Sequence, residues 1–98
     1  MNINIEKENG ITLMKLDGRL DTTTAPELEK AINAEGEALK NLVLDFKGID
    51  YISSAGLRVL LTAQKKMNAQ GQMELSNVCE AVMDIFEMTG FADILVIK

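Results

Sequence analysis

Apolar and polar residues follow two different periods along this chain. In residues 2–7 they alternate, which is typical of a half-buried β-strand. The pair Asn9-Gly10 favours a two-residue hairpin turn, because both residues tolerate positive φ. Residues 11–16 therefore form a second strand of the hairpin, and we expect Gly18 to end it.

The next segment combines the start signals of a helix with a helical period. Thr24 and Glu27 have the spacing of a capping box, and Pro26 fits the first turn. The pattern predicts a helix that fades near Gly36 and carries one apolar face, formed by Leu28, Ala31 and Ile32.

A second apolar segment is shorter and almost unbroken. Residues 42–46 read Leu-Val-Leu-Asp-Phe, which predicts a central strand covered on both faces. We expect the pair Lys47-Gly48 to end this strand, and residues 49–52 to form a connector.

A long helix is predicted after this connector. Apolar residues recur at helical spacing from Leu57 to Met67. Ser54 stands where an N-cap is expected, and Gly71 is placed to be the residue just past the helix.

The last third of the chain repeats the strand and helix signals once more. Residues 72–75 alternate like a strand, and residues 77–80 have the form of a second helix cap. A helical apolar stripe follows and ends at Gly90, and residues 94–97 predict a last short strand. The predicted order is β-β-α-β-α-β-α-β in a single α/β domain of residues 1–98, with right-handed crossovers that make the later strands parallel.

Composition excludes several classes of function. The net charge is −5, and no basic face for nucleic acid is visible. Histidine is absent and there is one cysteine, Cys79, so serine triads, most zinc sites and internal disulfides are excluded. No apolar run approaches the ~20 residues of a membrane span, and no signal peptide is apparent. We therefore expect a cytoplasmic protein without a cofactor, a metal site or membrane association.

Ser54 is the first candidate for chemistry, because it follows a strand and begins a helix. Helix N-termini favour anions, since the first N–H groups are unpaired and the peptide dipoles add there. A phosphate on Ser54 would be tolerated in that field. A plain N-cap explains the same serine on local sequence alone, and Ser53 is a loop hydroxyl with the same two interpretations.

Other polar residues acquire a role only if folding brings them to this turn. Asp21 is most simply an Asx-turn residue or a helix start, and the threonines that follow it are turn residues. Arg58 follows Ser54 by four residues, so it shares a helix face and could reach a phosphate there. Cys79 is more simply a structural thiol than a reactive one.

Three pieces of the sequence occur in an order typical of one family. Residues 16–21 read Leu-Asp-Gly-Arg-Leu-Asp, residues 49–57 read Ile-Asp-Tyr-Ile-Ser-Ser-Ala-Gly-Leu, and residues 82–91 end in Phe-Glu-Met-Thr-Gly-Phe. With these pieces the chain resembles the STAS family over nearly all of its length, and within it the single-domain anti-sigma factor antagonists. The resemblance implies a mixed sheet of four to five strands with helices mainly on one face. It also implies a binding protein and not an enzyme.

In that family the dephosphorylated antagonist binds an anti-sigma factor that is also a serine kinase, and the sigma factor is released. The kinase phosphorylates the motif serine and the complex falls apart, until a PP2C-type phosphatase restores the antagonist. The resemblance places the acceptor on Ser54, with Ser53 as second choice. It implies a partner-binding surface formed by Asp21, Thr22, Thr23, Ser53, Ser54, Ala55, Gly56 and Arg58.

Three positions depart from the family motif while the acceptor hydroxyl is retained. Ser53 replaces the usual aspartate, Ala55 replaces a serine or threonine, and Arg58 replaces a common glycine. A second interpretation is therefore a STAS scaffold or accessory subunit that is never phosphorylated, for example beside a transporter. A third is a small enzyme or nucleotide-binding domain, against which stand the missing histidine, the negative charge and the lack of a Gly-rich phosphate loop.

Overall fold

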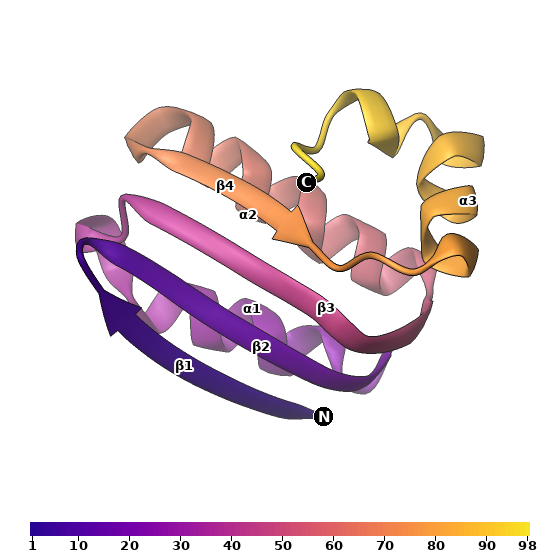
Figure 1. Cartoon of the computed structure of the whole chain (residues 1–98), viewed down its shortest axis with the longest axis horizontal. Coiled ribbons are helices and arrows are strands. Elements are labelled where there is room, and N and C mark those ends of the chain that lie inside the picture. The colour runs from indigo at the N-terminus through magenta and orange to yellow at the C-terminus, as the bar shows by residue number, and fades with distance from the viewer.

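The computed structural model describes all 98 residues and contains one four-stranded sheet, whose strands lie side by side in chain order (Figure 1). The first two strands pair antiparallel through the predicted Asn9-Gly10 turn, and the later pairs are parallel. The expected mixed sheet is therefore confirmed. The strands are β1 (Asn2–Glu8), β2 (Ile11–Leu20), β3 (Asn41–Ile52) and β4 (Gln72–Ser76).

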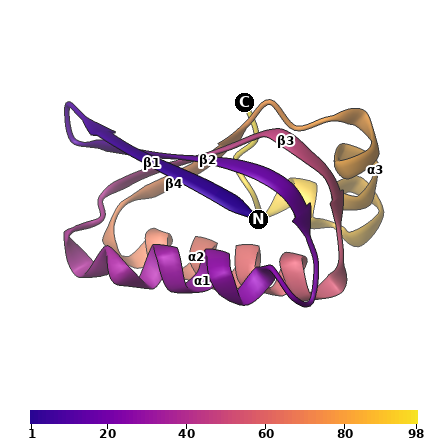
Figure 2. The ribbon, with the colours of Figure 1, turned by 90° about the horizontal axis from the view of Figure 1, so that it is seen from below.

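Three α-helices connect and flank these strands. Helices α1 and α2 lie next to each other beneath one face of the sheet, and α3 lies at the end of the sheet where β3 leads into α2 (Figure 2). This arrangement confirms helices mainly on one face. None of the helices combines the length and the apolar character that a bilayer crossing requires. The helices are α1 (Ala25–Ala34), α2 (Ser54–Gln70) and α3 (Glu80–Thr89), with 3₁₀ turns η1 (Gly36–Ala38) and η2 (Phe91–Asp93).

The core lies between the sheet and the α1–α2 layer. Met14 on β2 and Leu44 and Phe46 on β3 point toward the helices and are fully buried. Val43 and Asp45, on the opposite face of β3, are only half-buried. The expectation that residues 42–46 are covered on both faces is therefore wrong, because no helix lies over the outer face of this central strand.

Strands β2 and β3 both run past the glycines that were expected to end them. The pairing register shifts twice, so that two residues of β3 lie opposite Leu16 of β2 and two lie opposite Arg19. Such bulges absorb an extra residue without ending the strand and increase its twist. Gly18 and Lys47-Gly48 therefore lie within strands, and the expected connector at 49–52 is the last part of β3.

The C-terminal third departs from the prediction at two places. Cys79 takes the N-cap position of α3 without a side-chain cap, and the amide of Asn77 instead donates to Asp45 Oδ1 at 3.0 Å. The expected last strand is reduced to one parallel bridge, between Ile97 and Leu75. The predicted end of α3 is correct, because Gly90 adopts the left-handed conformation there.

Candidate functional site

The predicted acceptor serine lies at the carboxyl end of β3, where the chain turns into α2. Ser54 is the first residue of α2 and is exposed. The N-cap position belongs to Ser53, one residue earlier than expected, and its backbone is extended. Neither serine caps the helix with its side chain, and the Ser53 hydroxyl is buried without a hydrogen-bond partner.

The start of α2 is suited to a negative charge. The first helical hydrogen bond runs from Leu57 N to Ser53 O at 3.0 Å, so the N–H groups of residues 54–56 precede the helical ladder. No acidic residue occupies the first turn. Unpaired N–H groups and the helix dipole both favour an anion at such an end. A phosphate on Ser54 would lie close to these N–H groups and to the positive end of the helix dipole.

The loop that follows β2 lies directly beside this turn. Leu20 pairs with Ile52 at the end of the β2–β3 ladder, and Leu20 O accepts a hydrogen bond from Ser53 N at 2.9 Å. Parallel strands bring their carboxyl ends to one edge of the sheet. The next residue, Asp21, is therefore held at the same edge as Ser53 and Ser54, an arrangement that local sequence could not establish.

Asp21 forms an Asx turn and organises the start of α1. Its Oδ1 atom accepts hydrogen bonds from Thr23 N at 3.0 Å and from Thr24 N at 3.1 Å. The Thr24 N–H, then the Thr23 N–H, and also the nearby Arg19 lower the pKa of Asp21 below its usual value. The Thr24–Glu27 capping box is not formed, because the Thr24 hydroxyl donates to Arg19 O instead.

The remaining predicted residues divide into exposed and packed ones. Thr22, Thr23 and Arg58 are exposed, whereas Ala55 is half-buried. Gly56 is buried, and a Cβ atom there would lie 2.8 Å from Leu20 Cγ and from Ile52 Cγ1. Gly56 thus holds the start of α2 against the ends of β2 and β3 and offers little surface to a partner.

Two residues at this edge were missed by the sequence analysis. The Arg19 guanidinium lies over the Tyr51 ring, with Cζ 4.2 Å from the ring centroid. The sequence patterns placed Arg19 after the expected end of a strand and Tyr51 in a connector, so neither carried a signal of facing the other. The bulges that bring them opposite each other depend on strand pairing. Cys79 is half-buried, with Sγ 3.6 Å from Ile49 O, in keeping with the expected structural thiol.

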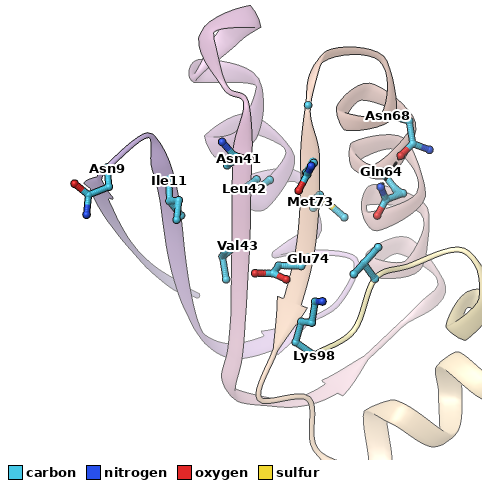
Figure 3. Close-up of a pocket in the computed structure, with 13 residues that line it drawn as sticks. Asn9, Ile11, Asn41, Leu42, Val43, Gln64, Asn68, Met73, Glu74 and Lys98 are labelled. Carbon is cyan, nitrogen blue, oxygen red and sulfur yellow. Dashed lines mark hydrogen bonds between the residues drawn. The ribbon is translucent and has the colours of Figure 1, made fainter.

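A groove of about 510 Å³ lies at the opposite end of the sheet, near the start of β3 and β4 (Figure 3). Apolar residues and two charged ones, Glu74 and Lys98, line it together with five carboxamide side chains: Asn9, Asn41, Gln64, Asn68 and Gln72. Gln64, on α2, is 4% exposed; its Nε2 donates to Asn68 Oδ1 at 2.8 Å and its buried Oε1 has no partner. None of the predicted site residues lines this groove, and no cluster of possible metal ligands occurs in the chain.

Comparisons with known proteins show which family the chain matches. The family model of the STAS domain matches residues 2–98. BtrV of Bordetella bronchiseptica, described as a candidate anti-sigma factor antagonist, is 34% identical over 96 residues, which cover 96% of this chain and 83% of that protein. The anti-sigma-B factor antagonist of Bacillus subtilis is 32% identical over 99 residues, which cover 97% of this chain and 90% of that protein.

The fold also matches a solved structure of the Bacillus cell fate determinant SpoIIAA in its phosphorylated form. The TM-score is 0.76 at 17% identity, and the match covers 99% of this chain and 91% of that one. At this level of identity the likeness concerns the fold alone.

Proposed function

Because the chain belongs to the STAS domain family, we propose that it is an anti-sigma factor antagonist switched by phosphorylation of Ser54. In its unmodified form it binds an anti-sigma factor that is also a serine kinase, and the sigma factor is released. Phosphorylation by that kinase ends the complex, and a PP2C-type phosphatase reverses it. The protein acts in the cytoplasm as a regulatory binding protein and not as an enzyme.

The observation that carries the proposal is the exposed Ser54 hydroxyl beside the Asp21 loop. Both lie at one edge of the sheet, because Leu20 O accepts from Ser53 N at 2.9 Å. A kinase can reach an exposed hydroxyl at the first residue of a helix without unfolding the domain. A partner docked on this edge would contact the hydroxyl and the loop together.

The switch follows from local electrostatics. Phosphorylation replaces a neutral hydroxyl with roughly −1.5 to −2 charges. The α2 N-terminus stabilises that charge, so the domain stays folded. A partner surface shaped for the neutral turn would meet added bulk, desolvation and repulsion with its own carboxylates. No large conformational change is needed.

Intact-mass measurement after incubation with the kinase and ATP tests the proposal. The wild-type chain should gain one phosphoryl group, and Ser54→Ala should gain none. Ser53→Ala is the matched control, because it removes the neighbouring hydroxyl and should be modified normally. A gain that survives Ser54→Ala would assign the acceptor elsewhere, and no gain in the wild type would favour the accessory-subunit interpretation.

Binding measurements give the second half of the test. Ser54→Ala should bind the anti-sigma factor with wild-type affinity and resist the kinase. Ser54→Asp should weaken binding by about tenfold to a hundredfold, because it places a carboxylate against a partner surface shaped for the neutral turn. Equal affinity of the two variants would contradict a switch at this hydroxyl.

A further inference from the structure

Arg19 and Tyr51 form an exposed pair at the same edge of the sheet as Ser54. The Arg19 side chain is 62% exposed, and Tyr51 is 39% exposed despite its large ring. Arg19 Cζ lies 4.2 Å from the ring centroid, well inside the range of a cation–π contact. Leu20, whose carbonyl binds Ser53 N, follows Arg19 directly.

The second bulge of β3 is what exposes the tyrosine. Two β3 residues, Asp50 and Tyr51, lie opposite Arg19 alone, so both are exposed between the buried Ile49 and Ile52. In a regular strand one of two neighbours would face the core. Bulges commonly re-aim a side chain next to a functional site.

The guanidinium is held from two sides before any partner arrives. The Tyr51 ring lies on one side, and Arg19 Nε lies 3.8 Å from Asp21 Oδ2. That second distance is longer than a hydrogen bond, so the N–H donors in the plane of the guanidinium remain available to another carboxylate. Stacking on the ring restricts the guanidinium, so it loses less entropy on binding than a free arginine would.

We propose that the Arg19–Tyr51 pair is the recognition point for a carboxylate on the partner that docks at the Ser54 turn. This inference rests on the proposed function. Arg19 requires an acidic group on the partner surface, and Asp21 beside it requires a cation. The opposite charges of Arg19 and Asp21 fix the orientation of docking and exclude partners with a uniformly basic face.

The test measures the dissociation constant of the unphosphorylated chain with its anti-sigma factor kinase. Arg19→Ala should weaken binding by about tenfold, and Arg19→Glu by about a hundredfold, because reversal adds repulsion. The Arg19→Glu loss should shrink as salt is raised. Lys65→Glu is the matched control for charge, since Lys65 is exposed on α2 about three turns from Ser54, and it should change affinity by less than about twofold.

The tyrosine variants separate stacking from hydrogen bonding. Tyr51→Phe keeps the ring and should bind like the wild type, whereas Tyr51→Ala frees the guanidinium and should weaken binding by about fivefold. Replacing the matching partner carboxylate by lysine should restore binding of Arg19→Glu. If the wild type binds and is phosphorylated while Arg19→Glu binds equally well, this inference alone is overturned. If the wild type neither binds nor gains phosphate, the proposed function fails with it.

Discussion

At the carboxyl end of β3 the surface carries hydroxyls and opposite charges, whereas the amino end of the same strand borders a groove whose polar lining is mostly carboxamides, with Glu74 and Lys98 as its charged residues. Ser54, Asp21 and Arg19 gather at the first end. Asn41 and Gln72 lie at the other, together with the buried Gln64. The two ends of the sheet therefore present different polar groups: hydroxyls and charges at one, and mostly carboxamides at the other.

Helix α2 connects the two ends and explains why they differ. It runs from Ser54 to Gln70, a length of about 26 Å at 1.5 Å per residue. Its dipole favours an anion at Ser54 and disfavours one near Gly71, beside the groove. A phosphorylation switch is therefore physically favoured at the first end only.

The largest expected loss of stability is that of a variant at the groove end of α2, Gly71→Ala. Gly71 ends α2, and a Cβ atom there would lie 1.9 Å from Lys40 O. That neighbour is backbone, and Lys40 O also accepts from Gln72 N at 2.8 Å, so it cannot easily move. Gly71→Ala should lower the free energy of unfolding by about 3 kcal/mol or more. Urea titration measures the loss, and binding per folded molecule should stay unchanged.

Gly90→Ala is the control for that variant. An added Cβ meets nothing within 4 Å there, but φ is +82°, so the variant should lose only about 1 kcal/mol from backbone strain. Equal losses in the two variants would mean that contact with Lys40 does not determine the choice of glycine at position 71.

Gly56→Ala applies the same change at the Ser54 end and should cost less stability. A Cβ atom there would lie 2.8 Å from the Leu20 and Ile52 side chains and 2.9 Å from Leu20 O, so a smaller shift relieves the overlap than the 1.9 Å contact at position 71 requires. We expect a loss of about 2 kcal/mol. Because the shift moves α2 relative to the Asp21 loop, partner binding per folded molecule should also fall by about tenfold. A loss of stability with unchanged affinity would contradict a shared docking edge.

Periodicity and turn chemistry predicted most of the elements correctly, because they depend on residues close in sequence. The Asn9-Gly10 hairpin and the end of α3 at Gly90 follow from local backbone preferences. The resemblance to the STAS family supplied what periodicity could not, namely helices mainly on one face. The expected coverage of β3 on both faces failed, because one aspartate in an apolar run does not reveal which face is open.

The candidate site could be predicted only in part. Motif position indicated Ser54, but its neighbour Asp21 is brought there by pairing of Leu20 with Ile52. The bulges also depend on pairing, so Gly18 and Lys47-Gly48 were wrongly expected to end strands. For the same reason the stacking of Arg19 on Tyr51 had no sequence signal, since it arises where one β2 residue faces two of β3.

A smaller effect is expected in how the contribution of Asp21 to stability depends on pH. The Thr24 and Thr23 N–H groups lower the pKa of Asp21 below its usual value of 3.8, so its carboxylate stabilises the fold at neutral pH. This contribution is lost as pH falls below about 4. Asp21→Asn should be less stable than the wild type at pH 7, and the difference should shrink in acid. Urea titrations at pH 7 and pH 3 measure it.

Asp45→Asn is the companion variant on the open face of the sheet. Partial burial acts to raise the pKa of Asp45, but hydrogen bonds from Asn77 and from Lys47 N, with nearby lysines, lower it overall. The stability that Asp45 contributes is therefore also lost as the pH falls, as it is for Asp21. Asp21→Asn alone should also weaken partner binding, because only Asp21 lies at the Ser54 edge. A constant stability difference across pH would contradict the hydrogen-bond explanation.

The smallest effect is expected at the groove, where a buried polar atom is unpaired. Gln64 Oε1 has no partner, so Gln64→Leu removes the penalty of burying it and loses only the bond to Asn68. We expect a change within about 1 kcal/mol, in the stabilising direction. Gln70→Leu is the matched control in the same helix: Gln70 Nε2 donates to Gly36 O and Leu39 O, so its loss should cost about 1–2 kcal/mol. If Gln64→Leu destabilises as much as Gln70→Leu, Gln64 Oε1 is paired in solution, and the carboxamides of the groove contribute to stability.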